Sequence, residues 1–319
     1  FTEKNAGKID FFREKIEEWY ISSQIDENEY SYLLASLLES VSKVANVAGV
    51  YGAFLKKWDS RALKKIEFIP VNSYEGSSKK FTIFNQKTED IISEVECDIL
   101  YLDPPYTQNQ YGTQYHLLET LVLNDKPSIS KITGSRPTGP MRSFWSKDPW
   151  AHILFDKIIF ETKAKYILFS YSSDGIMSKS FIEACLKRYG KAESFQCKNI
   201  SYKKYTNHKS KNKEEHYEYL FFIEKKECKD IQYESPLNYI GSKYRIIDEI
   251  KKRIKPTKNF IDVFSGGFNV GVNISSNKII FNDINHKVVD LIKSFHKFNS
   301  YDYISFVRKN IKKLTQKQI

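Results

Sequence analysis

The stretch CDILYLDPPY, residues 97–106, decides the fold class. Its first six residues form an apolar run of the length expected for a strand buried in a parallel sheet. Asp103, Pro104, Pro105 and Tyr106 follow directly, so they lie just past the carboxyl end of that strand, where open α/β sheets bind their ligands. The stretch therefore predicts an α/β fold with a ligand site at the end of this strand.

The chemistry of this tetrapeptide suits an exocyclic amine. The prolines fix φ and remove two N–H groups, so the carbonyls beside them are rigid hydrogen-bond acceptors. The Asp103 carboxylate and the Pro104 carbonyl could accept both hydrogens of a nucleobase amine, while Tyr106 stacks on a base flipped out of a duplex. The alternative is a turn that merely ends a strand, with Tyr106 in the core.

Two further apolar runs later in the sequence are predicted to extend the sheet. YILF at 166–169 and YLFFI at 219–223 read as strands, with a helical segment at 178–190 between them. Ser170 and Tyr171 end the first of these strands on the ligand side and are candidates for the target pocket. Towards the N-terminus, apolar residues recur every three or four positions, which predicts a helical lobe from Ile9 to Trp58.

A second candidate site lies near the C-terminus, in DVFSGGFNVG at 262–271. A helix at 244–254 and a strand at 260–264 precede this glycine turn, and a strand at 278–283 follows it. Such a turn lets a nucleotide-like ligand approach backbone N–H groups, and Asp283 is placed to accept ribose hydroxyls. The alternative is a glycine turn that serves only close helix packing.

Composition limits the class of protein. The 319 residues include 50 Lys and Arg against 39 Asp and Glu, and the net charge of +11 attracts polyanions such as nucleic acid. The four cysteines stand far apart, so neither a metal site nor a disulfide framework is expected. No apolar run approaches the ~20 residues of a membrane helix. We expect a cytoplasmic protein with no membrane partner.

The DPPY tetrapeptide resembles motif IV of the D12 class of adenine-N6 DNA methylases, which includes the GATC-modifying enzymes. The resemblance is closer still to FokI-type modification methylases, on the stretches 46–63, 110–121 and 166–175. It implies Asp103, Pro104, Pro105 and Tyr106 as catalytic residues. It also implies a DNA-contacting lobe near the N-terminus, with the following residues as phosphate partners: Lys56, Lys57 and Arg61.

The glycine turn with Asp283 resembles motifs I and II of the same methylases, and SPLNYIGSK at 235–243 resembles motif X. This implies S-adenosylmethionine as cofactor. The residues implied to bind it are Tyr239, Lys243, Asp262, Phe264, Ser265, Gly266, Gly267 and Asp283. The family often has glycine where Phe268 and Ser242 stand, so the tightness of the turn at Phe268 is in question.

A basic run with interleaved aromatics, residues 202–213, precedes the YLFFI strand. Lys203 and Lys204 in this run are candidate DNA contacts in a hairpin loop. A solvent-exposed loop without a ligand is the alternative.

The order of the motifs is exchanged relative to the methylases most resembled, because the lobe and DPPY come first and motifs X and I come last. A circular permutation is one explanation, and a cut through a tandem fusion of two methylases is the other. The start at Phe1 without Met, and the end at 312–319 before any second DPPY, favour the cut. We therefore expect a helical target-recognition lobe at 1–80, a catalytic half at 81–228 and an S-adenosylmethionine-binding half at 229–319.

Together these patterns predict a Rossmann-like S-adenosylmethionine-dependent methyltransferase sheet with a helical target-recognition lobe. The predicted reaction is methylation of adenine N6 in double-stranded DNA, without a metal, in a restriction-modification system with a cognate restriction endonuclease. Two alternatives stay open: an amino-methyltransferase acting on cytosine N4 or RNA, and a DNA-binding fragment without a competent site.

Overall fold

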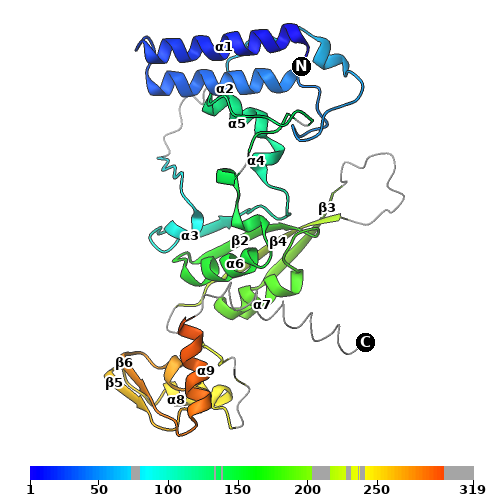
Figure 1. The fold of residues 1–319 in the computed structure, drawn as a ribbon. Helices are drawn as coiled ribbons and strands as arrows, with labels where there is room; N and C mark the ends of the chain where they lie inside the picture. Colours follow the sequence, from blue (N-terminus) through cyan, green and yellow to red (C-terminus); the bar gives the residue numbers. More distant parts are fainter. Residues whose placement is uncertain are drawn as a thin grey trace. The chain divides into compact units, whose positions relative to one another are not determined.

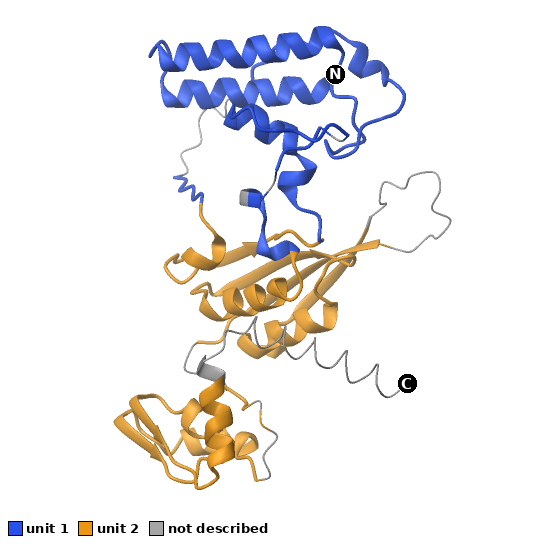
Figure 2. Cartoon of the chain, in the orientation of Figure 1, with its two compact units in different colours: residues 1–85, 108–146 blue, residues 86–107, 147–319 orange. Residues whose placement is uncertain are grey.

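The computed structural model describes residues 1–72, 80–132, 134–137, 139–202, 216–227, 231–235, 237 and 241–297. The chain divides into two compact units (Figures 1 and 2). The helical unit comprises residues 1–85 and 108–146, and the sheet unit comprises residues 86–107 and 147–319. The elements of both units together have the α/β character that the sequence predicts.

Two long helices, α1 (Glu3–Ile21) and α2 (Glu27–Lys43), form the framework of the helical unit (Figure 1). The Asp26 side chain begins α2 with a capping box, in which Asp26 and Glu29 each accept the other's backbone N–H. The helices α4 (Tyr111–Gln114) and α5 (His116–Leu123) complete the unit. The core consists of buried aliphatic side chains from both long helices and the segment after them: Ile9, Ile16, Leu34, Leu37, Val41, Val44 and Ile66.

The helical pattern expected to run as far as Trp58 ends earlier. Helix α2 stops at Lys43, and an antiparallel bridge between Val47 and Phe54 follows. Gly49, with φ of 90°, lies within this bridged turn in a conformation that L side chains rarely adopt. The periodicity of apolar residues could not reveal this turn, because it continues past the end of the helix.

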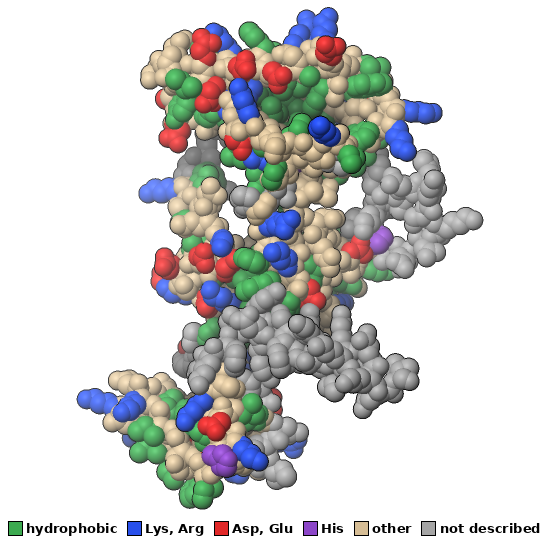
Figure 3. Space-filling model, in the orientation of Figure 1, with side chains coloured by type: hydrophobic (Ala, Val, Ile, Leu, Met, Phe, Trp, Pro, Cys, Tyr) green, Lys and Arg blue, Asp and Glu red, His purple; other side chains and the backbone are tan. Residues whose placement is uncertain are grey.

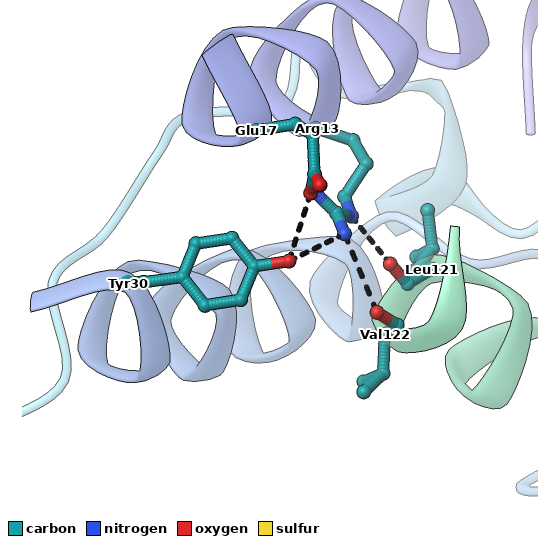
Figure 4. A network of polar contacts seen from close by, with 5 residues as sticks. All are labelled: Arg13, Glu17, Tyr30, Leu121 and Val122. Carbon is teal, nitrogen blue, oxygen red and sulfur yellow. Dashed lines mark hydrogen bonds and ion pairs between the residues drawn. The ribbon is translucent and has the colours of Figure 1, made fainter. Parts of the chain in front are cut away.

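A buried arginine joins α1 to the end of α5 (Figure 4). The Arg13 guanidinium, only 4% exposed, donates to the Glu17 carboxylate at 2.7 Å and to the Tyr30 hydroxyl at 2.8 Å. It also donates to the Leu121 and Val122 carbonyls at the C-terminus of α5. Burial alone would raise the pKa of Glu17, but the hydrogen bonds from Tyr30 and Arg13 outweigh it and lower that pKa.

Four strands form a mixed sheet in the sheet unit, in the order β1 (Ile99–Leu102), β2 (Tyr166–Ser172), β4 (His216–Glu224), β3 (Gln196–Tyr202). Strands β1 and β2 run parallel, and the other pairs are antiparallel. Three helices belong to this part: α3 (Thr88–Ile91), α6 (Trp150–Glu161) and α7 (Lys179–Tyr189).

Aromatic rings fill the core between the sheet and its helices. Phe155 of α6 lies 4.6 Å from Phe169 of β2, measured between ring centroids, and Phe169 lies 6.0 Å from Phe221 of β4. All three side chains are fully buried. By contrast, Ile99 and Tyr101 of β1 are 61% and 57% exposed. The parallel strand expected at 97–102 is therefore present but not buried, because β1 is the last strand of this sheet.

A separate two-stranded parallel sheet pairs β5 (Thr257–Asp262) with β6 (Ser276–Phe281). Helix α8 (Ile247–Lys251) precedes it and α9 (His286–Lys297) follows it. The helix expected at 244–254 is shorter in the structure, where a 3₁₀ turn at Tyr244–Ile246 leads into α8. Among the described helices, none has both the length and the apolar character that crossing a bilayer requires.

Replacing Arg13 with leucine should destabilise the helical unit by about 3 kcal/mol, because it leaves the Leu121 and Val122 carbonyls without this donor and the half-buried Glu17 carboxylate without its counter-charge. Urea unfolding followed by circular dichroism measures the effect. Lys15→Leu is the control, because Lys15 makes an exposed pair with Glu18 whose contribution is at most about 1 kcal/mol. Equal losses in the two variants would contradict the importance of the buried network.

Candidate active site

The DPPY tetrapeptide begins where the pairing of β1 with β2 ends, at the register pair Leu102 and Phe169. Asp103 is exposed, and Pro104, Pro105 and Tyr106 are half-buried. Neither proline can donate a ladder hydrogen bond, so the strand ends at Leu102. The predicted position, directly past the carboxyl end of a parallel strand, is confirmed.

The loop after β2 anchors the main chain of Tyr106. Its carbonyl accepts hydrogen bonds from the Ile176 N–H at 2.8 Å and from the Tyr171 hydroxyl at 3.4 Å. The same hydroxyl accepts the Met177 N–H at 3.1 Å, and burial raises the pKa of Tyr171. The Tyr106 and Tyr171 rings meet edge to face, with centroids 6.2 Å apart. Tyr171 therefore supports the last residue of the tetrapeptide, through both the main chain and the ring of Tyr106.

Gly175 is required by the position of this tyrosine. A Cβ atom added to Gly175 would lie 2.1 Å from Cε1 of Tyr171, far inside contact distance. The Ser170 hydroxyl, the other side chain expected on the ligand side, donates to the Glu218 carboxylate at 2.9 Å. Of the two candidates from this strand end, Tyr171 is thus fully buried and Ser170 is engaged with the neighbouring strand.

The glycine turn between β5 and β6 is tied to the residues that follow β6. Ser265 donates to the Asn282 carbonyl through its N–H at 3.0 Å and through its hydroxyl at 2.9 Å. Gly266 donates its N–H to the Asp283 carboxylate at 2.8 Å. The end of β6 therefore shapes the turn, as the loop after β2 shapes DPPY.

Phe268, where the family often has glycine, adopts the left-handed backbone conformation with φ of 67°. Such a conformation costs a non-glycine residue about 1 kcal/mol. The Phe268 ring is buried and lies 4.6 Å from the Phe281 ring, between centroids. Packing against Phe281 offsets the strain, so the turn forms without the additional glycine.

The two carboxylates near the turn differ in environment. Asp283 accepts the N–H groups of Asn285 and Gly266, each at 2.8 Å, and these bonds lower its pKa. Burial raises the pKa of Asp262, whose carboxylate accepts the Gly271 N–H at 3.0 Å. Asp283 remains ionised at neutral pH and keeps lone pairs for further donors. Asp262 closes the end of the turn.

Other predicted cofactor residues have mixed outcomes. Phe264 is 91% exposed beside the turn, and the Lys243 ammonium donates to the Gly241 carbonyl at 2.8 Å. Tyr239 lies outside the described residues. The sequence analysis did not identify Asn269 and Asn273, whose buried amides contact the segment leading into 235–243. The one sequence signal that could have identified them is their residue type, since an asparagine within an apolar pattern needs hydrogen-bond partners when it is buried.

The candidate DNA contacts lie in and after the bridged turn of the helical unit. Lys56 and Lys57 are exposed, whereas the Arg61 guanidinium donates to the Val47 carbonyl at 3.0 Å. Phe54 and Trp58 beside them are 67% and 51% exposed. Figure 3 shows basic and apolar side chains together on the surface of this unit. Two further candidates lie outside the described residues: Lys203 and Lys204.

The predicted residues thus gather in two places. Asp103 to Tyr106 follow the four-stranded sheet, and the turn with Asp262 and Asp283 belongs to the two-stranded sheet. In the part of the chain that the structure describes, no three His, Cys, Asp or Glu side chains are grouped as metal ligands.

Comparison with known protein families and proteins identifies the family of the chain. The family of D12 class N6 adenine-specific DNA methyltransferases matches residues 1–185 and 239–318, and the chain belongs to this family. Type II methyltransferase M.FokI of Planomicrobium okeanokoites is 37% identical in an alignment that covers 98% of this chain and 51% of that protein. Modification methylase StsI of Streptococcus sanguinis is 33% identical, over 91% of this chain and 47% of that protein.

A shorter relative is type II methyltransferase M.NlaIII of Neisseria lactamica, which is 36% identical over 70% of this chain and 67% of that protein. The chain spans about half the length of M.FokI and StsI. The predicted resemblance to D12 class and FokI-type methylases is therefore confirmed.

Replacing Gly175 with alanine should force Tyr171 out of its position and lower stability by about 1–3 kcal/mol. Thermal unfolding of the purified chain measures this loss. Gly7→Ala is the control, since a Cβ at Gly7 in helix α1 meets no atom within 4 Å. That variant should gain up to about 1 kcal/mol. Unchanged stability of Gly175→Ala would show that Tyr171 can move at little cost.

Proposed function

We propose that this protein is part of a site-specific DNA methyltransferase that transfers a methyl group from S-adenosylmethionine to N6 of a flipped-out adenine. The observation that carries the proposal is the exposed Asp103 carboxylate beside a Tyr106 main chain held at 2.8 Å by Ile176. Membership of an adenine-specific family supports adenine as the base.

The tetrapeptide supplies acceptors in a fixed geometry. Asp103 and the Pro104 carbonyl each accept one hydrogen of the adenine amine, which directs the nitrogen lone pair towards the methyl donor. Tyr106 stacks on the base, and its anchored carbonyl keeps the turn from relaxing. As the new N–C bond forms, the carbon–sulfur bond of the donor would break with its electron pair going to sulfur, so the amine nitrogen becomes positively charged. The Asp103 carboxylate stabilises that charge until one N–H proton passes to solvent. Catalysis comes from positioning and charge stabilisation.

The residues around the glycine turn fit the cofactor. S-adenosylmethionine, when bound, supplies an activated methyl group on a sulfonium with a good leaving group. Asp283 is ionised and has free lone pairs, as the acceptor of two ribose hydroxyls must be. We assign the remaining contacts to the residues that the family motifs indicate: Tyr239, Lys243, Asp262, Phe264, Ser265, Gly266 and Gly267.

The three sequence regions 1–80, 81–228 and 229–319 are proposed as the recognition lobe, the catalytic half and the cofactor half. A single alignment with M.FokI carries all of them in this order over half of that protein. This supports the interpretation that the DPPY half and the cofactor half belong to successive methylase units. The alternative is a circular permutation, in which this one chain builds one complete site. Methyl transfer by the chain alone would favour the permutation.

The biological setting is also a proposal. The relatives are named type II methyltransferases and modification methylases, which supports a role in a restriction-modification system with a cognate endonuclease. A cytoplasmic location is part of the same proposal, because that is where the DNA of bacteria, the source of M.FokI and StsI, is found.

In a preparation that transfers methyl, Asp103→Ala should lower that transfer at least about 100-fold and leave the affinity for S-adenosylmethionine unchanged, because it removes only an acceptor of the amine. Incorporation of radiolabelled methyl into DNA, followed by base analysis, measures the reaction. Asp98→Ala is the control, since Asp98 is an exposed acid just before β1. Undiminished turnover of Asp103→Ala would refute the catalytic assignment.

The labelled product distinguishes the alternatives. Label in cytosine N4 or in RNA would favour another amino-methyltransferase. If the wild-type chain binds duplex DNA but neither binds S-adenosylmethionine nor transfers methyl, the chain is a DNA-binding fragment without a competent site.

Replacing Lys56 and Lys57 with alanine should weaken binding to all duplex sequences and reduce the slope of log K against log salt by about 2, if each lysine neutralises one phosphate. Fluorescence anisotropy across a salt series measures the slope. The control is Lys15→Ala with Lys43→Ala, which removes the same charge from two helices where each lysine pairs with a glutamate. Equal slopes in both double variants would argue against a phosphate contact at 56 and 57.

A further inference from the structure

One side chain joins the two ends of the stretch 235–243 to the glycine turn. The Asn269 amide oxygen accepts the Ser235 N–H at 2.8 Å, and its amide nitrogen donates to the Ser242 hydroxyl at 3.0 Å. Asn269 is 4% exposed. Since Asn269 belongs to the turn itself, residues 235 and 242 are both held directly against the turn.

Asn273 makes a second connection of the same kind. Its amide oxygen accepts the Tyr233 N–H at 2.7 Å, and its amide nitrogen donates to the Tyr233 carbonyl at 2.7 Å and to the Asn269 carbonyl at 2.8 Å. Asn273 is 7% exposed. We call Asn269 and Asn273 the amide clamp.

A cavity adjoins the two segments that the amide clamp joins. Tyr233, Glu234 and Ser235 line one part of a cavity of about 620 Å³, and Gly267 and Phe268 line another part of it. Apolar packing therefore does not fill the whole region between the two segments. Buried amides that have all their partners are rigid, and removing one leaves buried donors and acceptors unpaired. The clamp is thus positioned to set the distance between the turn and the segment before 235–243.

We infer that Asn269 and Asn273 are positioning residues for the cofactor. They hold Ser235 and Ser242, the latter next to Lys243, at a fixed distance from the glycine turn, so that Lys243 and the turn meet one ligand. The inference rests on the proposed function, because the ligand in question is S-adenosylmethionine. Neither asparagine needs to touch it. Their effect on binding comes through the backbone they hold.

Calorimetric titration of the 319-residue chain with S-adenosylmethionine tests the inference. Asn269→Ala should raise the dissociation constant about tenfold, which corresponds to the loss of one to two hydrogen bonds. Asn269→Asp keeps the acceptor for Ser235, and the Ser242 hydroxyl can donate to the second carboxylate oxygen, so a change of less than threefold is expected. Ser242→Ala removes the bond to Asn269 and also the acceptor of the Tyr244 N–H, so about a threefold increase in the dissociation constant is expected.

The matched control is Asn5→Ala. Asn5, 2% exposed, links two segments of the helical unit in the same way, since it accepts the Ile66 N–H at 3.0 Å and donates to the Lys64 carbonyl at 2.8 Å. Its loss should reduce the stability of that unit without changing the cofactor dissociation constant. This control separates a general cost of removing a buried amide from an effect on the cofactor.

Hydrogen exchange of the Tyr233 and Ser235 amides, measured on the same proteins, reports the clamp itself. Faster exchange at Ser235 in Asn269→Ala together with weaker cofactor binding supports the inference. Faster exchange with wild-type affinity would overturn it, because the clamp would then be structural only. If Asn269→Ala does not fold, Ser242→Ala decides by the same criteria, with Asn269→Asp as the variant that keeps both hydrogen bonds.

A wild-type chain that binds no S-adenosylmethionine overturns the proposed function and this inference with it. Wild-type binding with unaffected variants overturns the inference alone. The two failures are therefore distinguishable.

Discussion

The parallel pairing of β1 with β2 is the constraint on which the catalytic assignment depends. It joins only four residues of β1 to their partners and stops at Leu102. Because the prolines that follow cannot continue the ladder, the chain must leave the sheet there, and Asp103 emerges next to the loop that follows β2. That loop then fixes Tyr106 through the Ile176 N–H.

The glycine turn uses the same physical arrangement. In both places, residues that follow one parallel strand are hydrogen-bonded by residues that follow the neighbouring strand: Tyr106 by Ile176, and Gly266 by Asp283. Each bond contributes only about 1 kcal/mol. These bonds matter mainly because they orient the backbone. Strand pairing fixes where the segments after the two strands begin, and the hydrogen bonds then fix how those segments are oriented.

Apolar runs were the most reliable sequence signal in this protein. The runs at 166–169 and 219–223 lie wholly in strands, because a sheet interior requires consecutive apolar residues, and the run at 97–102 contains the edge strand β1 (Ile99–Leu102). Strand β3 (Gln196–Tyr202) was not predicted, since Lys198 and Asn199 interrupt its pattern and it lies at the edge of the sheet. The end of α2 at Lys43 was also missed, because the bridge between Val47 and Phe54 depends on a glycine with positive φ.

The sequence by itself determined which residues form the two candidate sites and the chemistry that is predicted for them. Both sites are local sequence features. One is a carboxylate and two prolines after an apolar run, and the other is a glycine turn followed by an acid. Their chemistry follows from residues that are close together in the chain. Only the tertiary structure decided how these features are held. The supporting contacts join residues that are not neighbours in the chain: Tyr106 with Tyr171, Phe268 with Phe281, and Ser235 with Asn269. Such contacts have no periodic signature, because they form only when strand pairing and burial bring those residues together.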